Sequence, residues 1–305
     1  MRKLLLGFAL LSCFATEAQY NVDFGFKLGG ANYLGEIGGK EKTGRNFILD
    51  MKLNRSAIAA GGFVRYKFTP MVSGALSFTY GHIKGEDANS SNPGRVGRNL
   101  SFKNNIFELA FRGEVYLYNI NDVGNRGRYR LDFKSYAFLG IAGFHHNPQA
   151  RSDKYNGGAW TKLQPLQTEG VEYKNYALSI PGGIGFYMTQ KRKHRLGWEI
   201  GWSTAFTDYI DDVSSVYPEY SEVDPLVYDA FTNRTDDVDP SLLPLGGADN
   251  YTPGSKRGGA DKNDTYIFTT FNYSYVIKGR NSFYRQNYSW LSGRGGKRRT
   301  VRAKF

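Results

Sequence analysis

The stretch NIFELAFRGEVYLY at residues 105–118 has the clearest pattern in the chain. Apolar side chains occupy alternate positions, and most of the charged side chains fall between them. A period of two residues predicts a β-strand with one apolar face and one charged face. The apolar face is formed by Phe107, Leu109, Phe111, Val115 and Leu117, opposite Glu108, Arg112 and Glu114. Such a strand is typical of a membrane β-barrel, whose outside contacts lipid and whose inside is polar.

Alternation of the same kind predicts seven more strands, at residues 22–34, 58–68, 72–83, 133–145, 173–188, 195–207 and 265–277. Eight is an even number, as single-chain bacterial barrels require. Long connections at 35–57, 84–103, 146–172 and 208–264 alternate with shorter ones at 69–71, 119–132 and 189–194. We therefore predict an all-β fold, an antiparallel up-and-down transmembrane β-barrel with long outer loops, short periplasmic turns and periplasmic termini. A soluble lipocalin-like barrel or sandwich also alternates, but the loop asymmetry and the apolar face favour the membrane protein.

The first residues predict export. Arg2 and Lys3 precede an apolar run at 4–14, and small and polar residues follow up to Gln19. This is the pattern of a secretory signal peptide, so we predict a signal at 1–18, a barrel at 19–278 and a basic tail at 279–305. The single cysteine, Cys13, lies in the signal, so the mature chain can form neither a disulfide nor a thiolate metal site. A mean hydropathy of −0.49 is too polar for a helical membrane protein.

The net charge of +12 is unevenly divided along the chain. Residues 278–305 hold nine Lys or Arg and no acid, whereas residues 208–264 hold thirteen acids and four bases. The sequence therefore predicts a basic periplasmic face and an acidic outer loop. The candidate partner-binding residues are Lys191, Arg192, Lys193, Arg195, Arg280, Arg285, Arg294, Lys297, Arg298 and Arg299. A basic surface can also be simply solvated or rest on anionic lipid headgroups, and export argues against nucleic acid as the partner.

We expect the other notable residue clusters to have structural roles. Asp208, Asp211 and Asp212 offer the oxygen ligands that Ca²⁺ prefers, but they lack EF-hand spacing, so we expect hydrogen bonds at the barrel rim. Glu108, Arg112 and Glu114 should form an ion-pair network inside a barrel too narrow for a channel. Close packing is expected for the glycines at 182, 183 and 185.

Histidines provide the only enzyme hypothesis. His82, His145 and His146 could gather at the outer rim and activate water with a loop aspartate. No serine or carboxylate stands at a diagnostic spacing, so we expect no catalytic residue, and likewise no metal and no cofactor.

Six motifs in order along the chain resemble the PorG-type outer-membrane barrel of the Bacteroidetes type IX secretion system. They are GGANYLG at 29–35, YGHIKG at 80–85, RNLSF at 98–102, WTKLQPL at 160–166, TEG at 168–170 and FTDYIDDVS at 206–214. The resemblance implies a non-enzymatic component that binds a periplasmic ring, built from a PorK-type lipoprotein and its PorN-type partner, and links it to the outer membrane. In gliding members of the phylum the same system also exports adhesins. The alternative is a small outer-membrane transport or adhesion barrel whose outer loops bind a ligand or surface polymer.

Overall fold

The computed structural model describes residues 22–37, 57–88, 90, 92–121, 123, 131–191, 193–259, 263–277 and 288–289. The predicted signal peptide at 1–18 and almost all of the tail at 279–305 lie outside these residues. None of the described helices is long and apolar enough to cross a membrane.

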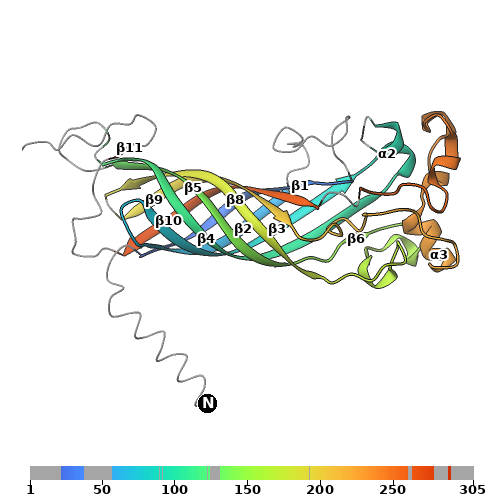
Figure 1. The fold of residues 1–305 in the computed structure, drawn as a ribbon, viewed down its shortest axis with the longest axis horizontal. Helices are drawn as coiled ribbons and strands as arrows, with labels where there is room; N and C mark the ends of the chain where they lie inside the picture. Colours follow the sequence, from blue (N-terminus) through green and yellow to red (C-terminus); the bar gives the residue numbers. More distant parts are fainter. Residues whose placement is uncertain are drawn as a thin grey trace, which may run out of the picture.

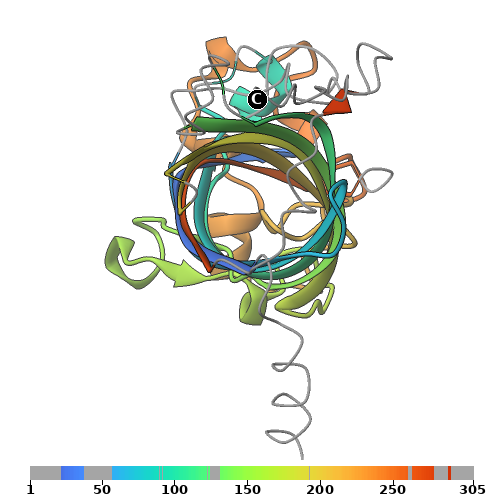
Figure 2. The ribbon, with the colours of Figure 1, turned by 90° about the vertical axis from the view of Figure 1, so that its left-hand side faces the viewer.

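Eight long strands form a closed antiparallel barrel, which Figure 2 shows end-on. They are β1 (Val22–Leu34), β2 (Ala57–Lys67), β3 (Val72–Glu86), β4 (Ser101–Ile120), β5 (Leu131–His145), β8 (Tyr176–Gln190), β9 (His194–Ala205) and β10 (Thr265–Ile277). Each strand pairs with the long strands before and after it, and β10 pairs with β1 to close the cylinder. The predicted antiparallel all-β barrel and all eight predicted strands are confirmed.

The outside of the barrel is apolar. On β4, Phe107, Leu109 and Phe111 are exposed, and the intervening Glu108 and Arg112 are buried, as the alternation predicted. Other strands present the same kind of outward side chain, among them Phe24, Phe26, Leu28, Leu76, Phe78, Leu139, Ile141, Leu178, Ile184, Leu196 and Phe271. An apolar band around a polar interior is the surface that a lipid bilayer requires.

Buried ion pairs occupy part of the barrel interior. Arg112 on β4 makes two hydrogen bonds to the carboxylate of Glu199 on β9, at 2.6 and 3.1 Å. Glu114 lies 3.7 Å from Arg112 and 2.6 Å from Arg65 of β2. Tyr136 donates a further hydrogen bond to Glu199 at 2.8 Å. The predicted network is therefore confirmed for Arg112 and Glu114, and it includes residues from strands far apart in the sequence.

Asp23 of β1 is a second centre of this network. It pairs with Arg65 at 3.2 Å and also with Arg195 of β9. Glu108, by contrast, has no arginine partner among the described residues and instead accepts hydrogen bonds from Ser203 and Tyr266. The prediction of an ion pair at Glu108 is wrong for the described residues, because the groups in hydrogen-bond contact with its carboxylate are hydroxyls.

Aromatic rings occupy the rest of the interior. Tyr116, Tyr136, Phe138 and Tyr187 form one buried cluster. The barrel accommodates them because β8 carries glycine where the rings approach it: a Cβ on Gly183 would lie 2.2 Å from the carbonyl oxygen of Ile200 and 2.5 Å from the ring of Phe138. The close-packing interpretation of the glycines at 182, 183 and 185 is confirmed at Gly183 and at Gly185, where a Cβ would lie 2.7 Å from the ring of Tyr136. Together the ion pairs and the rings fill the interior, as expected for eight strands.

The long connections lie at one end of the barrel, and the short turns, with residues 22 and 277, at the other (Figure 1). We call these the loop end and the turn end. At the loop end, L2 (87–100), L3 (146–175) and L4 (206–264) contain α2 (Pro93–Arg98), β6 (Gln149–Ala150), η3 (Asn156–Gly158), β7 (Thr161–Lys162), η4 (Gln164–Leu166), α3 (Pro225–Val227), η5 (Tyr228–Thr232), η6 (Thr235–Asp237), η7 (Pro240–Leu242) and η8 (Gly247–Tyr251). At the turn end, β11 (Tyr288–Ser289) pairs with β4.

Candidate functional sites at the two ends of the barrel

The first residues of L4 close the mouth of the barrel. Ile210 and Val213 are fully buried in an apolar cluster that also contains Ile83, Ile106 and Phe268 of the barrel strands. The segment is fixed in this position through its backbone, since the Asn104 side chain of β4 donates a hydrogen bond to the Ile210 carbonyl at 2.7 Å. Residues 206–214 are thus a plug at the loop end.

Above the plug, L3 and L4 pack against each other. Leu163 of L3 shares a second apolar cluster with Val223, Val227 and Phe231 of L4. A nearby cavity, lined in part by Leu163 and Phe231, has a volume of about 10 Å³. That is room for roughly one water molecule. We call the described parts of L2, L3 and L4, together with residues 35–37, the loop cap.

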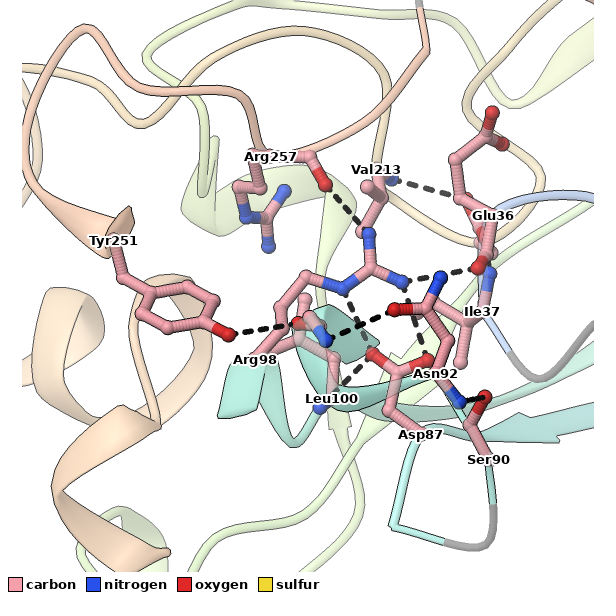
Figure 3. Close-up of polar contacts among 12 residues, drawn as sticks. Glu36, Ile37, Asp87, Ser90, Asn92, Arg98, Leu100, Val213, Tyr251 and Arg257 are labelled. Atoms are coloured by element: carbon pink, nitrogen blue, oxygen red, sulfur yellow. Dashed lines mark hydrogen bonds and ion pairs between the residues drawn. The ribbon is translucent and has the colours of Figure 1, made fainter. Parts of the chain in front are cut away.

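A buried arginine, Arg98, joins three parts of the loop cap (Figure 3). Its guanidinium donates two hydrogen bonds to Asp87 of L2, at 2.8 and 3.2 Å. It also donates to the backbone carbonyls of Glu36, at 3.0 Å, and Arg257, at 2.5 Å. Arg98 is the last residue of α2, a six-residue helix. The side chain of Asn92 caps this helix by accepting a hydrogen bond from the N–H of Gly94. The guanidinium of Arg98 therefore holds together the start of the first loop, L2 and the end of L4.

Arg257 joins L3 to L4 in the same way. It pairs with Glu169 of L3 at 2.7 Å and donates to the Asp212 carbonyl at 2.8 Å. Glu169 also accepts hydrogen bonds from the backbone of Ser214 and Ser215. Burial opposes the charge of Arg257, but Glu169 and Asp212 hold the pKa of this arginine above its usual value.

Carboxylates gather where the cap meets the barrel. One carboxylate oxygen from each of Glu36, Asp208 and Asp264 lies within 4.8 Å of the others. Asp211, buried beside them, accepts hydrogen bonds from the backbone N–H groups of Ile37 at 3.0 Å and Val213 at 3.1 Å. Burial raises the pKa of Glu36 to about 8, that of Asp208 to about 7 and that of Asp211 to about 6. Ionising the whole group without a counter-charge costs free energy.

The rim interpretation of Asp208, Asp211 and Asp212 is confirmed for two of the three. Asp211 accepts the two backbone hydrogen bonds just described, and Asp212 accepts from the hydroxyls of Thr168 and Tyr173. Asp208 differs, because neither of its carboxylate oxygens accepts a hydrogen bond from any described residue.

The three histidines have separate environments. The His82 ring hydrogen-bonds Asn105 at 2.7 Å, and the ring of His145 contacts Tyr176 on the outer face. His146 points inward and stacks on Tyr173. Burial lowers the pKa of His146 to about 4, so this ring is neutral at physiological pH. The structure therefore does not assemble the predicted histidine cluster.

The turn end holds the described part of the predicted docking surface. Lys191 and Lys193 are exposed in the turn between β8 and β9. Arg195 is only 7% exposed and pairs with Asp23 inside the barrel, so its assignment to a docking surface is wrong. The reason is that Arg195 lies within β9 beside the outward-facing Leu196, so alternation turns Arg195 to the inward face.

Seven of the predicted docking residues lie outside the described part of the chain: Arg192, Arg280, Arg285, Arg294, Lys297, Arg298 and Arg299. Within the tail, the backbone of β11 is described, and Tyr288 pairs with Asn119 of β4. β3 reaches only Val72, which pairs with Val115, so β4 extends beyond it at the turn end. The tail therefore returns to the barrel along this extension of β4.

Sequence reasoning did not identify the cap residues Arg98, Arg257, Asp87 and Glu36. A signal was present for one of them and for one partner, since RNLSF begins with Arg98 and TEG contains Glu169, which pairs with Arg257. FTDYIDDVS at 206–214 is the plug itself. These three motifs and WTKLQPL, which contains Leu163, thus meet in the loop cap, although nothing in their spacing indicated that they would.

The closed cylinder, the outward apolar band and the ion-paired interior define an outer-membrane β-barrel. The chain belongs to the family described as "Domain of unknown function (DUF6089)", which matches residues 1–238. No curated protein matches the sequence.

Several solved barrels are similar in structure. They include Ail, the attachment invasion locus protein of Yersinia pestis, in complex with the heparin analogue sucrose octasulfate (8% identity, 84% of this chain and 96% of that one, TM-score 0.34). OprG of Pseudomonas aeruginosa has 8% identity over 86% of this chain and 99% of its own, with a TM-score of 0.35. The N-terminal barrel of Pseudomonas aeruginosa OprF has 9% identity over 84% and 98%, with a TM-score of 0.31.

Proposed function

We propose that this barrel is a non-enzymatic component of a type IX protein secretion machinery, and that it anchors a periplasmic ring of the PorK and PorN type to the outer membrane. The observation that carries the proposal is the difference between the two ends. The loop end is closed by a plug and an ion-paired cap, whereas the turn end presents exposed Lys191 and Lys193 and, on β4, the returning tail.

The filled interior favours an anchor over a transport protein. The plug at 206–214 blocks the mouth, and charged pairs such as Arg112 with Glu199 occupy the lumen. A solute would have to separate buried ion pairs to pass, and this disfavours conduction. A barrel of this kind contributes position and rigidity to an assembly.

The proposed orientation places the turn end in the periplasm, because outer-membrane barrels direct their long loops outward. The nine positive charges at 278–305 would then face the ring. Complementary charge speeds encounter and sets orientation more than it adds affinity. The ring surface that this barrel contacts should accordingly be acidic.

Neutralising the turn end should weaken docking. The test variants are truncation after Gly279, Lys191→Gln with Lys193→Gln, and the two combined. Exposed ion pairs contribute only about 0.2 to 1 kcal/mol each, so the double substitution alone should have a small effect and the combination a large one. We expect recovery of the ring proteins with the affinity-tagged barrel to fall at least several-fold in the combination, and the remaining association to be less salt-sensitive.

The control is Lys162→Gln with Lys174→Gln, which removes two exposed lysines from L3 at the opposite end. It should leave ring recovery unchanged. Equal ring recovery from the wild type and the combined variant, at equal barrel levels, would reject docking through the turn end.

A further inference from the structure

The carboxylates of Glu36, Asp208 and Asp264 come from three separate places in the chain. Glu36 follows β1, Asp208 lies in the plug, and Asp264 precedes β10. Their oxygen atoms nevertheless lie within 4.8 Å of one another. Oxygens bound to one Ca²⁺ at about 2.3 to 2.6 Å are at most about 4.6 to 5.2 Å apart, so the three atoms are spaced as ligands of a single ion would be.

This group forms no ion pair among the described residues, unlike the other buried acids nearby, although Arg98 is close enough for its charge to favour ionised Glu36. Asp87 and Glu169 in the cap each form an ion pair with an arginine, and so do Asp23, Glu114 and Glu199 in the lumen. In the part of the chain that the structure describes, no ion pair involves Glu36, Asp208 or Asp264. Arg98 contacts Glu36 only at the backbone carbonyl, and in Figure 3 the Glu36 carboxylate points away from this arginine.

Asp208 supplies a second, independent observation. Its side chain is buried, with 8% of the residue exposed. Both of its carboxylate oxygens are inaccessible, and neither accepts a hydrogen bond from a described residue, the Ser214 hydroxyl being near but outside hydrogen-bond geometry. A buried carboxylate without a donor is costly, and buried polar groups are normally satisfied. Asp208 is instead directed at two other carboxylates, an arrangement that a cation between them would explain.

We propose that Glu36, Asp208 and Asp264 bind one divalent cation, Ca²⁺, at the mouth of the barrel. Ca²⁺ accepts six to eight oxygen ligands in flexible geometry, which suits carboxylates held by irregular loop segments better than the strict octahedron of Mg²⁺. Asp264 also accepts hydrogen bonds from Tyr33 and from the N–H of Ile210, and these orient its carboxylate.

The ion would connect the two ends of L4 with the start of the first loop. Asp208 and Asp264 lie near the two ends of L4, and the backbone of Glu36 is already bound to Arg98. A cation at this point would therefore join the plug to β1 and β10 and stabilise the loop cap. This inference is independent of the proposed secretion role.

Calcium titration of the purified full-length barrel tests the proposal. Protein in detergent is stripped with EDTA, dialysed and titrated with CaCl₂ in a calorimeter, and with MgCl₂ in a parallel experiment. The variants are Asp208→Asn and Glu36→Gln, with Asp249→Asn as the control because Asp249 is an exposed acid of the same loop. Heat-dependent gel migration verifies that each barrel is folded.

We expect one saturable calcium site in the wild type and in the control, weaker binding of magnesium, and at least tenfold weaker calcium binding in Asp208→Asn and Glu36→Gln. Both substitutions keep a side-chain oxygen that can accept a hydrogen bond and do not change the size of the side chain, so both variants should fold. Absence of saturable calcium binding in the wild type, or equal affinity in the wild type and both site variants, would overturn the proposal.

Discussion

Replacing Arg257 with methionine is expected to open the loop cap while the barrel stays folded. The substitution leaves Glu169 buried without its cation and removes the hydrogen bond to the Asp212 carbonyl. Loss of one partner of a buried ion pair costs about 3 to 5 kcal/mol. That energy corresponds to a roughly 100-fold to several-thousand-fold increase in the open population of the cap.

Limited proteolysis of the purified barrel measures this opening. Proteinase K should cut Arg257→Met within L4 at least 100-fold faster than it cuts the wild type. Arg234→Met is the matched control, because Arg234 pairs with Asp237 near the surface of the same loop and should matter little. An unchanged cleavage rate in Arg257→Met would show that Arg257 does not hold L3 and L4 together.

The second large effect is expected in the lumen. Arg112→Met leaves the buried carboxylate of Glu199 without the arginine that binds it through two hydrogen bonds. The free energy of unfolding should fall by about 3 to 5 kcal/mol. Glu114 loses less, because Arg65 still lies 2.6 Å from it.

Urea unfolding of barrels in lipid vesicles, followed by tryptophan fluorescence, measures that loss. Combining Arg112→Met with Glu199→Met removes the uncompensated charge, so the double variant should recover more than half of the lost stability. If the double variant is as unstable as the sum of both single variants, the two side chains act independently and the ion pair is not the cause.

The barrel could be predicted from the sequence because its signal is local. Each strand of the barrel has an apolar outer face and a polar inner face, so the alternation of its own residues is enough to predict β4. Strand ends are harder to predict than strands. The alternation places Tyr173 in a strand, but Tyr173 precedes β8 and donates a hydrogen bond to Asp212. Arg195 faces the lumen because it lies within β9 next to Leu196, which faces outward, so its charge belongs to the interior and not to the turn.

The loop cap could not be predicted, because its contacts join residues distant in the chain. Arg98 donates hydrogen bonds to the backbone carbonyls of Glu36 and Arg257. Every residue has such a carbonyl, so the sequence does not indicate which one the arginine binds. The carboxylate group of Glu36, Asp208 and Asp264 likewise forms only when L4 folds back into the mouth. The adjacent aspartates in the sequence indicate a cluster at Asp211 and Asp212 instead, and in the structure both of these carboxylates accept hydrogen bonds.

Affinity purification of the full-length barrel from gently solubilised membranes of its native host tests the anchoring role most directly. Crosslinking through a photoreactive residue placed at Lys193 would identify what lies against the turn end, and the same residue at Asp249 would serve as the loop-end comparison. We predict that the turn-end position crosslinks to a periplasmic ring lipoprotein or its partner and that the loop-end position does not. Recovery of the barrel alone, or ring crosslinks only from the loop end, would contradict the account.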